Sequence, residues 1–138
     1  MSYIDPNCFP MKLPKNLKNL TKEYTIAAAY SGELGLLKDL RQQNPPCPWD
    51  EMTCAAASMN GNLNILQWAR EQNPPCPWDV NTFIYAVMNG HLDILKWIST
   101  QNPNWNDLPI SFLSKIAHQN VLTWLCEQYY QRHGNIYS

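Results

Sequence analysis

The chain has 138 residues, of which 45% are hydrophobic and 15% charged, which suits one domain with a buried core and argues against a disordered chain. A formal net charge of -1 gives no overall electrostatic attraction to nucleic acid or to an anionic membrane surface. No stretch approaches the roughly 18 apolar residues of a membrane span, and the N-terminus lacks the basic start and apolar run of a signal peptide. We therefore expect an intracellular protein, located in the cytoplasm or in the cytoplasm of a host cell.

The first segment, residues 1–19, is expected to be an arm that precedes the repeated part of the chain. Lysines stand in it and just after it, at Lys12, Lys15, Lys18 and Lys22. Lysines without interleaved arginine or an aromatic stacking platform are a weak indication of nucleic-acid binding. We expect a solvated face here and no nucleic-acid partner.

The central part of the chain repeats itself. The octapeptide QNPPCPWD occurs at positions 43–50 and again at 72–79, and the segments 25–41, 54–70 and 83–99 align at the same 29-residue offset. A fourth copy, 110–126, fits at an offset of 27, because its connection shortens to QNPNWND. A fixed period of this length is typical of stacked units that share a core with their neighbours.

Each copy predicts two short helices joined by a glycine turn. Small residues dominate the first helix, which we place at about 51–59 and 80–88, with Asp50 and Asp79 as N-cap residues. Apolar residues then recur at helical spacing, as at Leu63, Leu66 and Ala69. Gly32, Gly61 and Gly90 fall between the helices, where a left-handed residue commonly ends a helix. The Pro-Pro pair then predicts an extended connection to the next helix pair.

The residues AVMNGHLDILKW, 86–97, resemble the ankyrin-repeat pattern A-A-x-x-G-H-x-x-I-V-x-L. The resemblance covers Leu20 to Gln128 as four units. The T-P-L-H box that usually opens the first helix is absent, since Asn81, Thr82, Phe83 and Ile84 stand there, and a Cys-Pro-Trp segment replaces the usual hairpin. This looks like the tryptophan-rich ankyrin variant with Cys-Pro-Trp-Asp connections, plentiful in large DNA viruses and some protists.

The resemblance implies an all-α, ankyrin-type α-solenoid of about four helix-turn-helix repeats, with Pro-rich extended connections. It also implies a non-enzymatic protein-binding function on the concave side. The expected divisions are an arm at 1–19, repeats at 20–128 and a Tyr-rich tail at 129–138. The partner is another protein, and a monomer is favoured over a homo-oligomer. The alternative is a structural subunit fixed in a larger assembly, possibly a viral one, with the arm and tail as contacts.

Several conspicuous side chains are expected to have structural roles. Trp68, Trp97 and Trp124 share one repeat position and should pack in the core, while Trp49 and Trp78 should cover helix ends. His91 stands where ankyrin repeats often place a histidine that ties turns together by hydrogen bonds. Cys126 and His118 lack a third, orienting group.

The odd cysteine count favours reduced thiols over a disulfide framework, and the spacings do not match a zinc site. We therefore expect no catalytic, cofactor-binding or metal-binding residues. The cysteines are Cys8, Cys47, Cys54, Cys76 and Cys126.

The resemblance to ankyrin repeats implies a candidate binding surface on the concave side, a row of residues two positions before each turn: Tyr30, Met59, Met88 and, in the last unit, Lys115. One tyrosine and two adaptable methionines suit an apolar segment of a partner. Alternatively, these side chains fill the seams between repeats. Glu51, Val80 and Asn106, beside the connections, complete the expected surface.

Overall fold

The computed structural model describes residues 19–101 and 103–134, without the side chains of Asn106, Asp107 and His133. Most of the N-terminal arm, including Cys8 and the lysines at 12, 15 and 18, lies outside the described residues, as does the tail beyond Gly134.

Every regular element in the two described ranges is a helix, which confirms the all-α class. The elements in chain order are α1 (Lys22–Ser31), α2 (Leu34–Arg41), α3 (Glu51–Met59), α4 (Leu63–Glu71), α5 (Val80–Asn89), α6 (Leu92–Thr100), the short 3-10 helix η3 (Asn104–Asp107), α7 (Ile110–Ile116) and α8 (Gln119–His133). No helix in these ranges combines the length and the apolar character that crossing a bilayer requires.

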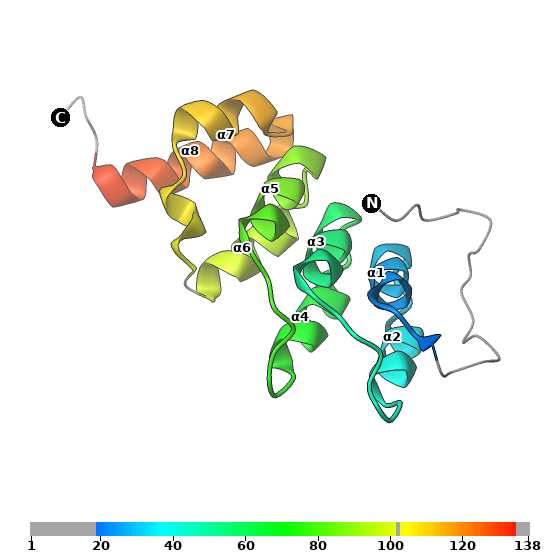
Figure 1. Cartoon of the computed structure of the whole chain (residues 1–138). Coiled ribbons are helices and arrows are strands. Elements are labelled where there is room, and N and C mark those ends of the chain that lie inside the picture. The colour runs from blue at the N-terminus through cyan, green and yellow to red at the C-terminus, as the bar shows by residue number, and fades with distance from the viewer. Residues whose placement is uncertain (1–18, 102, 135–138) are drawn as a thin grey trace.

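Consecutive helices form pairs, and the pairs stack in chain order. Helix α1 contacts α2, α3 contacts α4, and the later helices pair in the same way. The first helices also contact one another in sequence, α1 with α3, α3 with α5 and α5 with α7. Figure 1 shows α1, α3 and α5 side by side in one row, with α2, α4 and α6 in a second row. The 29-residue period of the sequence thus becomes a lateral step from one pair to the next.

Small side chains allow the first helices to approach closely. Ala28 and Ala29 of α1 are fully buried, as are Ala55 and Ala57 of α3. Helix α5 places the larger Phe83 in the same layer, and it is 1% exposed.

Helices α3 and α5 begin where the sequence indicates. A side-chain oxygen of Asp50 accepts a hydrogen bond from the Met52 amide at 2.9 Å, and Asp79 accepts one from the Asn81 amide at 3.0 Å. Each contact satisfies an amide that has no partner within the helix. The two predicted N-caps are confirmed.

The predicted glycine turns are also confirmed. Gly32, Gly61 and Gly90 have φ angles of 82, 76 and 75°, which side chains with a Cβ rarely adopt. In the last pair Ala117 stands at this position with φ -70°. The turn between α7 and α8 is therefore built differently from the earlier three.

The second helices bury one apolar stripe each. Leu37, Leu66 and Leu95 occupy equivalent positions and are fully buried, and burying a leucine stabilises a fold by about 1.5–3 kcal/mol. Trp68, Trp97 and Trp124 are half-buried and pack against the core from outside. The prediction that these tryptophans pack in the core is therefore met only in part.

The connections between pairs end in extended backbone at Asp50 and Asp79, as expected. Cys47 and Cys76 are 1% and 0% exposed and are free thiols, which confirms that they are small buried groups. The Asn44–Pro45 and Asn73–Pro74 peptide bonds are both cis, which the sequence alone did not indicate.

The last helix pair differs from the others. The contact between α7 and α5 is smaller than those of α1 with α3 and of α3 with α5. Helix α8 has 15 residues and includes Tyr129 and Tyr130. The expected boundary between repeats and tail, at position 128, therefore falls inside a continuous helix.

Candidate functional site

The residues of the candidate row occupy one equivalent position on each of the stacked first helices. Tyr30 and Met59 are half-buried, whereas Met88 is 47% exposed and Lys115 is also exposed. Since α1, α3 and α5 pack side by side, Tyr30, Met59 and Met88 follow one another across the stack. The row therefore becomes more accessible from α1 towards α5.

Side chains of the following repeat form hydrogen bonds with the backbone carbonyls of residues in this row. Asn60 Nδ2 donates to the Tyr30 carbonyl at 2.7 Å, and Asn62 Nδ2 donates to the same carbonyl at 3.0 Å. His91 Nε2 lies 3.1 Å from the Met59 carbonyl, one repeat further on. Because the same backbone position is held from the next repeat twice, the spacing of the row is fixed between α1 and α5.

The joint to the last pair is different. Asn120 Nδ2 donates to the Gly90 carbonyl at 2.9 Å, and the His118 amide donates to the Val87 carbonyl at 3.0 Å. These hydrogen bonds hold the carbonyls of Val87 and Gly90, which flank Met88 in the sequence, and not the Met88 carbonyl itself. Lys115 therefore does not continue the row with the geometry of the first three members.

Two of the three flanking residues lie at the other end of the first helices. Glu51 is exposed and Val80 half-buried, and both are the first residues of their helices. Asn106 is in η3, and its side chain is outside the described residues. At 1.5 Å per residue, Glu51 is about 12 Å along α3 from Met59. Glu51 and Met59 therefore lie at opposite ends of α3.

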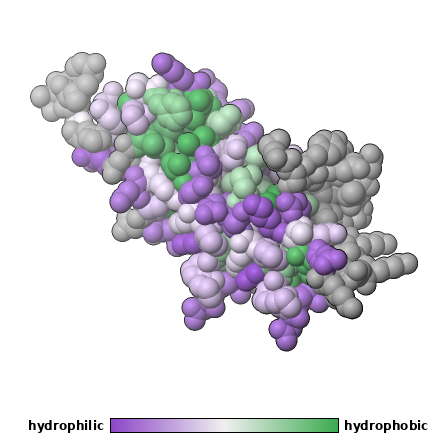
Figure 2. All heavy atoms as spheres, viewed as in Figure 1, coloured by the Kyte–Doolittle hydropathy of each residue, from purple (hydrophilic) through white to green (hydrophobic). Residues whose placement is uncertain are grey.

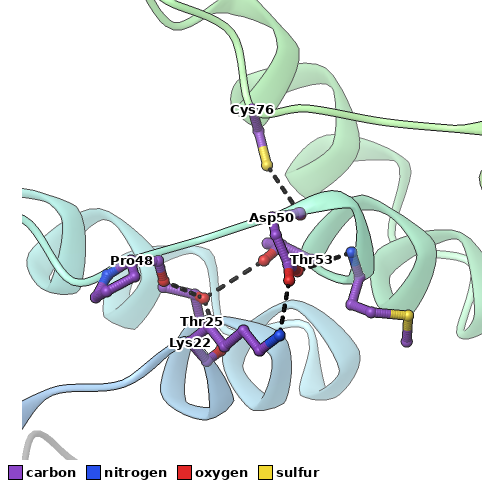
Figure 3. A network of polar contacts seen from close by, with 7 residues as sticks. Lys22, Thr25, Pro48, Asp50, Thr53 and Cys76 are labelled. Atoms are coloured by element: carbon purple, nitrogen blue, oxygen red, sulfur yellow. Dashed lines mark hydrogen bonds and ion pairs between the residues drawn. The ribbon is translucent and has the colours of Figure 1, made fainter.

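Asp50 is a junction between three consecutive units, as Figure 3 shows. Its carboxylate caps α3 and also receives the Lys22 ammonium of α1 at 3.0 Å. Its backbone carbonyl accepts a contact from the Cys76 thiol of the next connection at 3.5 Å. One repeat earlier, the Cys47 thiol reaches the Thr21 carbonyl at 3.2 Å. The cysteine and the aspartate of QNPPCPWD thus recur because each connection is anchored on the one before it.

A threonine lies beside this junction. The Thr25 hydroxyl lies 2.8 Å from both the Lys22 and the Pro48 carbonyl oxygens, which share its one proton, and it is 3.4 Å from the Thr53 hydroxyl. These contacts join α1, the connection and α3 (Figure 3).

An arginine and two tryptophans form a second repeated arrangement, which the sequence reasoning missed. The Arg41 guanidinium lies 4.0 Å from the Trp49 ring centre and donates to the Cys47 carbonyl at 2.7 Å. Trp49 meets Trp68 edge to face at 5.9 Å. The available signal was the spacing, because an arginine precedes the connection tryptophan by the same interval in both full-length connections.

The next repeat reproduces this arrangement. Arg70 lies 4.1 Å from the Trp78 ring and donates to the Cys76 carbonyl at 2.7 Å. Trp78 meets Trp97 edge to face at 5.9 Å. The connection tryptophans therefore cover the ends of the second helices, as expected, and they do so by stacking with arginine.

Two hollows lie outside the candidate row. One, of about 400 Å³, lies between the ends of α2 and α4 beside Trp49 and Trp68. The other, of about 340 Å³, is lined mainly by apolar residues of α5, α7 and α8, among them Phe83, Leu113 and Leu125. Figure 2 shows hydrophobic side chains gathered over the α7–α8 end of the stack.

The thiols of Cys47 and Cys76 are poorly placed for reaction, because both are buried. A hydrogen bond with the Cys54 thiol and burial both raise the pKa of Cys76, and burial raises the pKa of Cys47. His118 Nδ1 is held by Asn120 Oδ1 at 2.7 Å. In residues 19–101 and 103–134 no three histidine, cysteine or acidic side chains are grouped so that they could hold a metal ion.

Comparison of the chain with protein-family models, with curated proteins and with solved structures found no match.

Proposed function

We propose that this chain is an ankyrin-type solenoid of four helix-turn-helix units that acts as a non-enzymatic protein-interaction module. The observation that carries the proposal is the row Tyr30, Met59 and Met88. These residues occupy equivalent positions on stacked helices, and hydrogen bonds from the next repeat hold the carbonyls of the first two. A row of large side chains at fixed spacing offers a partner several anchoring points at once.

At the α5 end of the row, the exposure of the side chain favours a role in partner binding over a role in filling the seam between repeats. A side chain that fills a seam is covered by its neighbours, yet Met88 is 47% exposed. Met59 is half-buried, so it contributes to packing as well. We therefore assign the main contact with a partner to Met88 and its surroundings, and a supporting role to Tyr30 and Met59. The buried free thiols support a reducing, intracellular compartment.

The test is affinity capture from the native source with the intact chain and two matched variants. Met88→Glu places a charge in the row, whereas Met52→Glu places the same charge on another methionine, which is 40% exposed and outside the row. We expect Met88→Glu to lose the captured partner and Met52→Glu to retain it. Thermal unfolding should shift little in either variant, because exposed sites tolerate substitution within about 0.5 kcal/mol. Equal capture by both variants would contradict the assignment.

A specific feature favours the second candidate function, a structural subunit in a larger assembly. The α7–α8 end has the apolar hollow of about 340 Å³. Phe112 of α7 and Tyr130 of α8 are also 43% and 45% exposed. An exposed apolar end of this kind is typical of surfaces that other proteins cover. Light scattering separates the two candidates, since an interaction module should be monomeric alone and an obligate subunit should self-associate.

A further inference from the structure

We propose that the hollow between the ends of α2 and α4, here named the tryptophan cleft, binds a short acidic segment of a partner protein that carries an aromatic side chain. Its volume is about 400 Å³, and its walls include Lys38, Arg41, Trp49, Trp68, Gln72 and Pro74. This site is separate from the candidate row and does not depend on the function proposed above.

The positive charges in the cleft favour binding of an anion. Both charged side chains that line it, Lys38 and Arg41, are cations, and no carboxylate is among the lining residues. The Lys38 ammonium lies 5.9 Å from the Trp68 ring centre, and Arg41 lies 4.0 Å from that of Trp49. Burial lowers the pKa of the Arg41 guanidinium, so its positive charge is partly desolvated. A carboxylate brought into the cleft would compensate these charges.

The third connection shows that an indole in this position accepts a further aromatic ring. Trp78 contacts Arg70 and Trp97, in the same way as Trp49 contacts Arg41 and Trp68. Trp78 also contacts Trp105 edge to face, with 4.6 Å between the ring centres. In the described part of the chain, Trp49 has no ring contact that corresponds to Trp105. An aromatic side chain from a partner would provide the missing contact, in the geometry that aromatic pairs prefer.

The surroundings favour a peptide over a nucleic acid. Asp39 and Glu71 are exposed on the two helices that border the cleft. These carboxylates would repel a continuous phosphate backbone, whereas one or two carboxylates directed at Lys38 and Arg41 can avoid them. Nucleic-acid binding also gains from many cationic contacts, and the cleft offers two.

The cleft lies away from the row. Helix α2 begins beside the Gly32 turn and ends at Arg41, so about 12 Å of helix separates the two ends. A variant of the row therefore leaves the cleft intact, and the two sites can be tested independently.

The probe is an unlabelled peptide, Gly-Asp-Tyr-Glu-Gly, titrated into the full chain at low salt and followed by isothermal titration calorimetry. Lys38→Glu is the test variant. Lys96→Glu is its matched control, because Lys96 holds the same repeat position in α6, is exposed, and lies outside the lining of the cleft. We expect Lys38→Glu to weaken binding by about tenfold or more and Lys96→Glu and Met88→Glu to bind as the unmodified chain does.

Two further peptides separate the contributions. A peptide with Asn and Gln in place of Asp and Glu should lose binding, and one with Ala in place of Tyr should bind more weakly. The proposal is overturned if Lys38→Glu and Lys96→Glu weaken binding equally, which would indicate a general effect of charge. It is also overturned if the acidic peptide does not bind at millimolar concentration, or if oligo(dT) binds in its place and displaces it. Thermal unfolding of both variants establishes that they are folded.

Discussion

The imidazole ring of His91 lies directly against Gly61. A Cβ atom on Gly61 would stand 2.8 Å from Cε1 and 2.9 Å from Nδ1 of His91. The same relationship holds one repeat earlier, where a Cβ on Gly32 would stand 3.3 Å from Oδ1 of Asn62. Each turn glycine is therefore required twice, once by its positive φ angle and once by the side chain that reaches over it from the next repeat.

Gly61→Ala should destabilise the protein more than Gly32→Ala does. Both substitutions force alanine into the left-handed region, which costs about 1–2 kcal/mol. Only Gly61→Ala also displaces a ring that holds the Met59 carbonyl. Urea denaturation measures both free energies of unfolding. If the two substitutions lower the free energy of unfolding equally, the contact between His91 and Gly61 does not contribute to stability.

Gly35→Ala serves as the matched control. Gly35 lies in α2, is exposed, and an added Cβ meets no atom within 4 Å. Gly35 stands in the first turn of α2, where the preference for alanine is smaller than the value of about 0.8–1 kcal/mol in a helix interior, so this substitution should stabilise the protein slightly. Destabilisation by Gly35→Ala would show that alanine at a glycine position is harmful here for another reason.

The sequence predicts the features that depend on local chemistry. Asp50 and Asp79 cap helices because the carboxylate reaches an amide two residues away, and the turn glycines follow from backbone geometry. Both signals lie within a few residues of the feature that they specify, so no knowledge of the tertiary packing is needed to find them.

Features set by tertiary packing were missed or only partly foreseen. Met59 and Met88 share a repeat position, yet only Met88 is exposed, because the next helix differs. Arg41 stacks on Trp49, and this contact depends on the conformation of the connection between them, which the sequence does not predict. Helix α8 continues past position 128, where no glycine or proline stops it before Gly134. Such features depend on neighbours that one repeat does not contain.

Asp50→Asn should lower stability at low salt, whereas Asp79→Asn should not. Asparagine keeps an N-cap acceptor in both cases, so the caps survive. Asp50 also pairs with Lys22, and the position equivalent to Lys22 one repeat later is Glu51. Thermal unfolding at low and at high ionic strength separates the two effects, since salt screens an exposed ion pair. A salt-independent loss for Asp50→Asn would exclude the ion pair as its cause.

Leu66→Ala should destabilise the fold much more than Leu122→Ala. The two leucines hold the same repeat position, but Leu66 is fully buried in α4 and Leu122 is half-buried in α8. Truncating a buried leucine costs about 2–5 kcal/mol, and the cost grows with the cavity that remains. Chemical denaturation of both variants provides the comparison. Similar costs would show that the last pair is packed as tightly as the inner ones.

The buried thiols should make the protein less stable in mild alkali. The pKa values of Cys47 and Cys76 are raised in the folded chain. Above the ordinary cysteine pKa of about 8.5, the unfolded chain therefore loses protons that the folded chain keeps. The free energy of unfolding then falls as pH rises, by up to about 1.4 kcal/mol per pH unit for each such thiol. Below pH 8 this contribution to stability is fully present.

Urea denaturation between about pH 7 and pH 10 measures the slope, and Cys76→Ala should reduce it. Cys126→Ala, which removes a partly exposed thiol instead, is the matched control. Lys22 also has a raised pKa, owing to its hydrogen bond with Asp50, and its contribution is lost only as pH rises above the ordinary lysine value. The range below pH 10 therefore isolates the thiols. An unchanged slope in Cys76→Ala would show that the Cys76 thiol ionises as readily in the folded chain as in the unfolded one.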